Sequence, residues 1–337
     1  ERSMSASAFS PRPAIAKMLQ GGITCFSDLY YYPDVTGTVA AEAGVRAVLG
    51  MIALDFPTAW AKDVEEYLRK GLEVHDRFKA APLITTSFAP HAPYSVADTT
   101  LIPIRRLADD LDLPVHMQVL ETAAEVAAAV AATGRRPLAR LAALGLATPA
   151  LMAVHATELV ADEIELLATA GASVVHCPRS NLKLAAGLCP VARLLDAGVN
   201  VALGTDGAAS SHRLDLWSEM QTAALLGKHG AANAAALPAA AALRMATING
   251  ARALGLGGEI GSLVAGKAAD VICVDLSSIE HQPLLDPIAQ LVYPGSRHDV
   301  TDVWVAGEQL VAERIAMRLD VAETGAAAER WGRQLRA

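Results

Sequence analysis

Carboxylate and imidazole side chains follow several short apolar segments of this chain. Asp206 lies three residues after the apolar run Val199–Leu203, and His155 and His176 each come directly after another such run. In α/β barrels, the polar groups at the carboxyl ends of buried parallel strands face one pocket. The spacing therefore predicts a pocket in which a carboxylate meets two imidazoles.

Two more polar positions fit the same pocket. Glu121 follows the strand-like run Val115–Val119, which carries His116 and Gln118. A carboxyl group at a pocket rim shuttles protons when burial raises its pKa, although an acid here could also simply open the next helix. His91 lies in a loop bounded by prolines, and stiff loops of this kind position side chains over a ligand.

Each of these residues also has a structural interpretation. Asp206 could cap a turn, His155 could be a core histidine, and His176 could either contact substrate or support its neighbours. Their occurrence together at strand ends favours function. His212 flanks the Asp206 loop. The remaining histidines are predicted to lie at the surface: His75, His229, His281 and His298.

Short apolar runs alternate with alanine-rich helical patterns, which is typical of parallel βα units. The predicted strands are Gly22–Ser27, Val45–Ile52, Leu83–Phe88, Val115–Val119, Leu151–Val154, Ala172–His176 and Val199–Gly204. The predicted helices include Ala14–Gln20, Trp60–Phe78, Asp98–Leu111, Ala123–Ala132 and Ala161–Ala170.

The predicted fold is an α/β barrel of the (β/α)8 TIM type with a small partial β-sandwich on its C-terminal side. Seven strands are recognised where a closed barrel has eight, so we expect the first strand to be missing. We expect a barrel over residues 1–258, then two hairpins and a closing helix, Ala322–Leu335, over residues 259–337. The first hairpin is expected within Glu259–Asp275 and the second within Val300–Val311.

Composition narrows the class of protein. The 337 residues are 53% hydrophobic and carry a formal net charge of −8, which favours neither nucleic acid nor an anionic membrane. The four cysteines form no close pair, which predicts reduced thiols. The first residues lack the apolar core of a signal peptide, and no run is long enough to span a membrane. We therefore expect a cytoplasmic protein.

Taken together, these segments resemble the amidohydrolase superfamily, and within it the 5-methylthioadenosine/S-adenosylhomocysteine deaminases and their chlorohydrolase-like relatives. The resemblance extends over nearly the whole chain. The segments that carry it begin at Gly22 (Gly-Ile-Thr-Cys-Phe-Ser-Asp), Ala89 (Ala-Pro-His-Ala-Pro-Tyr), Leu120 (Leu-Glu-Thr), Ala153 (Ala-Val-His), His176 (His-Cys-Pro-Arg-Ser-Asn), Leu203 (Leu-Gly-Thr-Asp-Gly) and Ile260 (Ile-Gly-Ser-Leu-Val-Ala-Gly-Lys).

The resemblance implies a zinc-dependent hydrolytic deaminase of adenine nucleosides, in which the metal activates a water molecule. By motif, Asp206 would ligate the metal, Glu121 would move protons, His155 would stabilise the attacking oxygen, and His91 would contact substrate. His176 is a further candidate for substrate contact. The substrates implied are 5′-methylthioadenosine, S-adenosylhomocysteine or adenosine, each giving an inosine product and ammonia. We expect no nucleic acid or membrane partner. We do expect the chain to associate with itself into a homo-oligomer.

Two positions depart from the family pattern. The nine histidines include no His-x-His pair, and Gln118 stands where the family has a histidine ligand. An amide is a poorer zinc ligand than imidazole, so we expect zinc to bind weakly or not at all. His116 shares the strand face of Gln118 but lies one pleat repeat away.

Two alternatives stay open at this stage. One is a non-catalytic homologue that acts as a binding or partner subunit. The other is a hydrolase of triazines or other heterocycles. If the first strand is missing, the strands that contain Thr24 and Ala202 would also expose unpaired backbone groups.

Overall fold

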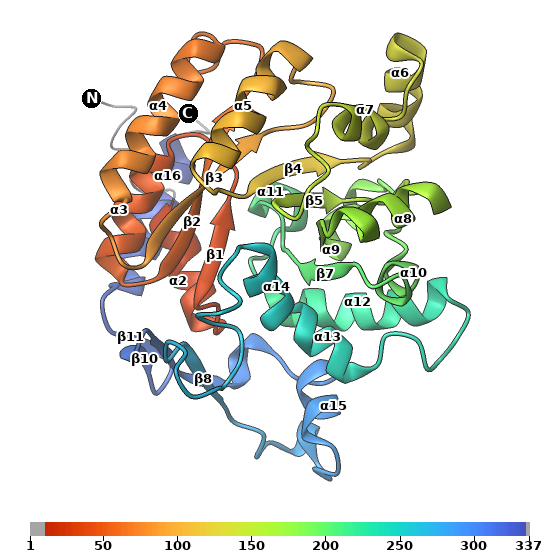
Figure 1. The fold of residues 1–337 in the computed structure, drawn as a ribbon. Helices are drawn as coiled ribbons and strands as arrows, with labels where there is room; N and C mark the ends of the chain where they lie inside the picture. Colours follow the sequence, from red (N-terminus) through yellow and green to blue (C-terminus); the bar gives the residue numbers. More distant parts are fainter. Residues whose placement is uncertain (1–10, 335–337) are drawn as a thin grey trace.

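A curled parallel sheet and a separate antiparallel sheet organise the chain in the computed structural model, which describes residues 11–334 (Figure 1). The larger sheet has seven strands in sequential order from β1 to β7, and the smaller has the order β11-β10-β9-β8. The seven parallel strands are β1 (Cys25–Asp28), β2 (Arg46–Ala53), β3 (Ile84–Pro90), β4 (Val115–Val119), β5 (Leu151–His155), β6 (Ser173–His176) and β7 (Asn200–Leu203).

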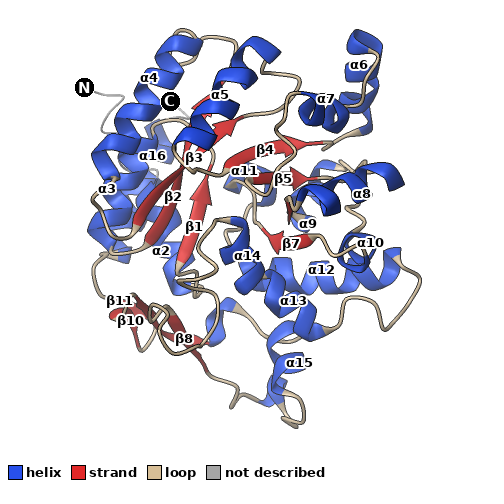
Figure 2. Cartoon of the chain, viewed as in Figure 1, coloured by secondary structure: helices blue, strands red, loops and turns tan. Residues whose placement is uncertain are grey.

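The seven predicted strands are confirmed, within a few residues at their ends. Helices separate the strands and cover the outer face of the sheet, as the alternating pattern predicted (Figure 2). The helices of this part are α2 (Pro11–Gln20), α3 (Pro33–Ala43), α4 (Val64–Phe78), α5 (Asp98–Asp110), α6 (Ala123–Thr133), α7 (Pro137–Ala143), α8 (Ala161–Ala170), α9 (Pro178–Leu184), α10 (Val191–Asp196), α11 (Ala208–Ser211), α12 (Leu216–Gly230), α13 (Ala239–Met245) and α14 (Ile248–Ala253).

Helix α4 begins four residues later than Trp60, where the sequence predicted its start. The carboxylate of Asp63 accepts a hydrogen bond from the backbone N–H of Glu66 and caps the helix there. An aspartate N-cap fixes a helix start because it satisfies a backbone donor that has no partner within the helix.

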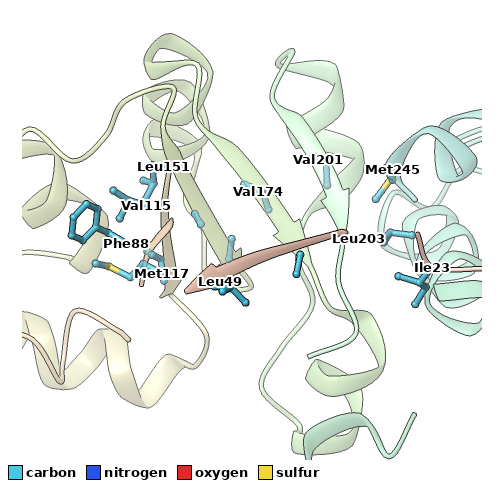
Figure 3. Packing of buried hydrophobic residues seen from close by; sticks show 14 of the residues in the cluster. Ile23, Leu49, Phe88, Val115, Met117, Leu151, Val174, Val201, Leu203 and Met245 are labelled. Carbon is cyan, nitrogen blue, oxygen red and sulfur yellow. The ribbon is translucent and has the colours of Figure 1, made fainter. Parts of the chain in front are cut away.

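The core lies between the sheet and its helices. Strand β2 is buried along its whole length, as expected of a strand that is covered on both faces. Side chains from several strands pack there, among them Leu49, Phe88 and Met117 (Figure 3). Burying one such side chain stabilises a fold by about 1.5–3 kcal/mol, so this packing fixes the strand ends that carry the polar groups.

Strands β1 and β7 are the two ends of the parallel sheet, as predicted for the strands that contain Thr24 and Ala202. Helix α14 covers β7: the amide of Asn249 donates to the carbonyl of Val201 at 2.9 Å, and Asn200 donates to the carbonyl of Asn249 at 3.0 Å. An asparagine side chain therefore satisfies a backbone acceptor at this edge of the sheet.

The C-terminal part is only partly as predicted. The second hairpin is confirmed, because β9 (Val300–Val305) pairs antiparallel with β10 (Glu308–Ala312). The first hairpin is wrong: only β8 (Val271–Val274) forms, and it pairs with β9. The remaining elements are η1 (Ile279–His281), α15 (Pro287–Val292), η2 (Arg297–Asp299), β11 (Ile315–Ala316) and α16 (Val321–Gln334).

The segment expected as the first strand of that hairpin turns at Gly261 and Gly266, which both have positive φ. Its Ile260 is buried against Val48, while Leu263 is 82% exposed. A strand needs a partner along its length, and these turns prevent one. The predicted closing helix is confirmed as α16. Its expected last residue, Leu335, lies outside the described residues, and so do residues 1–10, where the sequence predicts no signal peptide.

The division at residue 258 stays a prediction. Buried Arg46 on β2 bonds the buried carboxylate of Asp270 at 3.2 Å, so a charged contact joins the parallel sheet to the segment that leads into β8.

Within residues 11–334, no helix has the length and apolar content to cross a membrane.

Candidate active site

The strand-end groups predicted from the sequence gather at the carboxyl edge of the parallel sheet. His155 is the last residue of β5 and is fully buried, with a positive φ of 73°. Its Nε2 lies 3.7 Å from Oε1 of Glu121, which follows β4. A buried imidazole and a carboxyl group from neighbouring strands therefore face each other.

The tautomer of His155 follows from its neighbour. The side-chain amide of Asn181 lies with its Nδ2 3.0 Å from Nδ1 of His155. An amide nitrogen only donates, so Nδ1 accepts and the ring proton of neutral His155 is on Nε2. Burial lowers the pKa of His155 most, and the charge of Asp206 opposes that shift. His155 is thus held as a neutral donor aimed toward Glu121.

Glu121 is suited to carry a proton. Burial raises its pKa, and the charges of Asp206 and Glu125 raise it further. Its backbone N–H donates to Oε2 of Glu125 at 2.9 Å, and the backbone N–H of Glu125 donates to the hydroxyl of Thr122. This reciprocal capping fixes the main chain at the start of α6 while the Glu121 side chain stays 18% exposed.

Asp206 lies just beyond β7 in a left-handed backbone conformation, with φ of 57°. Its Oδ2 accepts from the hydroxyl of Ser180 at 2.6 Å, and its Oδ1 accepts from the backbone N–H of Gly207. The sequence prediction of a strand-end carboxylate is therefore confirmed in position, with both oxygens already hydrogen-bonded by the protein.

His91 and His176 border the same region. The Nδ1 of His91 lies 2.9 Å from the hydroxyl of Ser95, and its ring packs edge-on against Tyr94. His176, the last residue of β6, is buried, and burial together with His155 lowers its pKa to about 3. Its Nδ1 finds no hydrogen-bond partner among the described residues. His176 therefore carries an unpaired ring nitrogen inside the fold, whereas His91 is partly exposed.

Gln118 and His116 occupy one face of β4, as their spacing predicted, because the residues between and beside them are the buried ones. The Nδ1 of His116 lies 3.1 Å from the hydroxyl of Ser27 on β1, although β2 and β3 lie between β1 and β4 in the order of the sheet. Burial lowers the pKa of His116 to about 4. His116 is thus a neutral residue that links β4 to β1 inside the curled sheet.

Several neighbours were not singled out from the sequence. Ser180 bonds Asp206 and Asn181 bonds His155; in the sequence they belong to the segment beginning at His176 that carries the family resemblance. Glu219 on α12 accepts from the backbone N–H of Arg179 at 3.0 Å. Asp28 ends β1, has a pKa raised by burial, and accepts from Thr36. Asp28 follows an apolar strand, which is the signal that identified the other strand-end groups.

The other histidines lie away from this cluster. His229 and His298 are exposed as predicted, and His212 is exposed with its Nδ1 2.7 Å from the Lys183 amine. The surface prediction was wrong for His281, which is 1% exposed, because its Nε2 lies 3.3 Å from the carboxylate of Asp299. His75 is half-buried and bonds Thr86. The four cysteines are free thiols.

The donor atoms of the cluster do not suit a metal ion as they stand. Within residues 11–334, no group of three His, Cys, Asp or Glu side chains is placed to hold a metal. Both oxygens of Asp206 accept protein hydrogen bonds, Gln118 offers an amide, and Nδ1 of His155 is occupied by Asn181. The described residues therefore do not make a complete ligand set.

The curled parallel sheet, with carboxyl and imidazole groups at its carboxyl edge, is the arrangement that α/β-barrel enzymes use for their active sites. A match to the Amidohydrolase family covers residues 4–310, and the chain belongs to that family. It is thus a hydrolase that acts on carbon–nitrogen bonds.

Curated relatives agree with this assignment. The chain is 49% identical over 322 residues to a protein from Teredinibacter turnerae named 5-methylthioadenosine/S-adenosylhomocysteine deaminase, covering 96% of this chain and 73% of the relative. It is 48% identical over 318 residues to a protein of the same name from Saccharophagus degradans, covering 94% and 71%.

Solved structures share the fold. An adenosine deaminase from Xanthomonas campestris with bound zinc is 51% identical, with a TM-score of 0.96, and the match covers 98% of this chain and 75% of that one. An atrazine chlorohydrolase from Arthrobacter aurescens in complex with zinc has a TM-score of 0.89 at 24% identity, with coverage of 96% and 76%. The second likeness shows the fold alone.

Proposed function

We propose that this chain carries the active-site residues of a hydrolytic deaminase that converts 5′-methylthioadenosine, S-adenosylhomocysteine or adenosine to the inosine product and ammonia. The observation that carries the proposal is the pairing of His155, a neutral Nε2–H donor, with the raised-pKa carboxyl group of Glu121 at 3.7 Å. The names of the relatives supply the substrate class.

The proposed roles follow from the geometry. Glu121 gives a proton to a nitrogen of the purine ring and later passes one to the leaving amine, since burial raises its pKa and so favours the protonated carboxyl group. His155 donates from Nε2 to the oxygen that attacks the ring, because its other nitrogen is engaged by Asn181. His91 and His176 contact the substrate.

Asp206 and Gln118 are the proposed metal positions. We propose zinc as the ion, as in the Xanthomonas relative, and expect it to bind this chain weakly. The motivation is that the described residues offer no three-ligand set and that Gln118 contributes an amide. The roles assigned above are those of the protein's own side chains.

The test combines a substrate panel with metal analysis of the purified chain. Loss of adenine absorbance and release of ammonia from one of the three nucleosides supports the proposal. Turnover of an aminated or chlorinated triazine, and of no nucleoside, identifies a heterocycle hydrolase instead. Nucleoside binding without turnover at saturating zinc identifies the non-catalytic homologue, which the incomplete ligand set favours as the second candidate.

A homo-oligomer that works in the cytoplasm completes the proposal. The support is the chemistry of the chain: reduced cysteines suit a reducing compartment, and the end strand β1 offers an edge for association. Analytical ultracentrifugation tests the oligomer, and a single monomeric species over the micromolar range contradicts it.

A further inference from the structure

Three consecutive residues of α9 each make a different contact at the candidate site. The backbone N–H of Arg179 donates to Glu219, the hydroxyl of Ser180 donates to Asp206, and the amide of Asn181 donates to His155. The contacts of Ser180 and Asn181 reach groups with proposed roles in the reaction. The contact of Arg179 reaches Glu219, a buried carboxyl group on α12.

Helix α9 packs into the chain through its first turn, where Pro178, Ser180 and Asn181 are buried. It is only seven residues long, too short to be stable by itself. Leu182 and Leu184 are about half exposed. Near the end of α9, the Lys183 amine donates to the carbonyl of Ala209 on α11. The start of α9, which carries Ser180 and Asn181, is the buried end of the helix, and Glu219 accepts the backbone N–H of Arg179 there.

Glu219 is a costly residue to bury. It lies on α12 with 0% exposure, and its Oε1 finds no hydrogen-bond partner within the described part of the chain. The Nε of Arg179 is also buried there without one. A buried polar group lowers stability unless it is satisfied, so a residue of this kind is expected to have a role that an apolar side chain could not fill.

We infer that Glu219 is a positioning residue: by holding the first turn of α9, it sets the orientation of both His155 and Asp206. The inference goes beyond the proposed roles of the residues that contact substrate, and it rests on the proposed function only for its consequence in turnover. The contacts of Glu219 are a property of the folded chain, so they can be measured without any reaction.

The hydrogen bond needs an acceptor at Glu219 rather than a negative charge. Burial raises the pKa of Glu219 to about 8, opposed by the backbone N–H and the charge of Arg179 and supported by the charges of Asp215 and Asp206. Below that pH the group is a neutral acceptor. Glutamine offers the same acceptor, whereas leucine has a similar size and none.

The test measures the tautomer of His155 by NMR of histidine labelled with nitrogen-15, with the signal assigned through His155→Gln. In the unchanged chain and in Glu219→Gln, we expect one neutral tautomer with the proton on Nε2. In Glu219→Leu, Asn181 loses its alignment and the signal becomes that of a tautomer mixture. Glu163→Leu is the matched control, because Glu163 is a buried carboxylate on α8 that bonds Arg136 instead.

A single Nε2–H tautomer in Glu219→Leu, or an equal mixture in Glu163→Leu, overturns the inference. Hydrogen exchange of the Arg179 amide is a second readout that does not depend on the leucine variant folding. We expect Glu219→Gln to protect this amide within about fivefold of the unchanged chain, the scale of one hydrogen bond. An Arg179 amide that exchanges as in an unstructured peptide, in the unchanged chain, also overturns it.

The outcome is separable from that of the proposed function. If no nucleoside is turned over but the tautomer responds to Glu219→Leu and not to Glu219→Gln, the positioning role stands and the reaction is wrong. If turnover is found and the tautomer is indifferent to Glu219, the reaction stands and the positioning role is wrong.

Discussion

The two halves of the strand-end cluster are built differently. In the α9 half, which comprises His155, His176 and Asp206, two side chains are held by hydrogen bonds from consecutive residues of one helix. In the β4 half, which comprises Gln118 and Glu121, hydrogen bonds fix the main chain beside Glu121, but neither side chain has a hydrogen bond to another of residues 11–334. The α9 half is oriented before a ligand arrives, and the β4 half is not.

This difference suggests a division of labour. A group that must donate a hydrogen bond from a fixed place gains from being oriented in advance, because no reorganisation is needed during the reaction. A group that carries a proton between two sites gains from a side chain that can turn. His155 meets the first description, and Glu121, 18% exposed and fixed only through its backbone, meets the second.

Removing the carboxyl group of Glu121 is the most severe test of the β4 half. Glu121→Gln keeps the size and polarity but cannot move a proton, so turnover of the nucleoside should fall by about 10²–10⁴-fold with substrate binding nearly unchanged. The loss of adenine absorbance measures the rate. Glu165→Gln, an exposed glutamate on α8, is the control and should keep full activity. Full activity of Glu121→Gln would show that the proton carrier is another group.

The variant Gln118→His tests whether the amide of Gln118 is the reason that zinc is expected to bind weakly. Losing one ligand or its support commonly costs about 10–100-fold in metal affinity, so Gln118→His should raise zinc affinity by about that factor. Calorimetric titration of the purified chain measures it, with Gln221→His on α12 as the control. An unchanged dissociation constant would show that Gln118 is not at a ligand position.

The sequence predicted the strands and the strand-end groups because both depend on local patterns. Short apolar runs followed by Asp206, His155 or Glu121 have a period and an end that can be read directly. Helices α12, α13 and α14 were not predicted, and their places depend on contacts with distant segments, such as Asn249 on the Val201 carbonyl.

The residues that hold the cluster could not be predicted for the same reason. Glu219 contacts Arg179 across 40 positions of the chain, and nothing in its own surroundings marks it as buried. The surface prediction for His281 failed in this way too, since its partner Asp299 comes from another turn. Contacts between distant segments depend on the complete fold, which local periodicity does not specify.

Ionisation of Glu219 should make the free energy of unfolding of the chain depend on pH. Because burial raises its pKa from 4.5 to about 8, the folded chain binds a proton more tightly than the unfolded chain. Stability should therefore fall as pH rises from about 4.5 to about 8, by at most about 1.4 kcal/mol per pH unit. Urea unfolding at several pH values measures the slope.

Glu219→Gln should flatten that slope, since glutamine does not titrate. Thr222→Val, a change on the same helix that does not involve a titrating group, should keep it. Equal slopes in the unchanged chain and Glu219→Gln would show that Glu219 does not carry a raised pKa in the folded state.

The smallest effect is expected at the capping residue of the β4 half. Thr122→Ala removes the hydroxyl that accepts from the backbone N–H of Glu125, and loss of such a cap costs about 1 kcal/mol. Because the same turn sets the backbone of Glu121, hydrogen exchange should quicken at Glu125 and at Glu121 while the Arg179 amide keeps its protection. Thr122→Ser, which keeps the hydroxyl, is the control. If the Arg179 amide also lost protection in Thr122→Ala, the two halves would be one cooperative unit and their difference in construction would carry no division of labour.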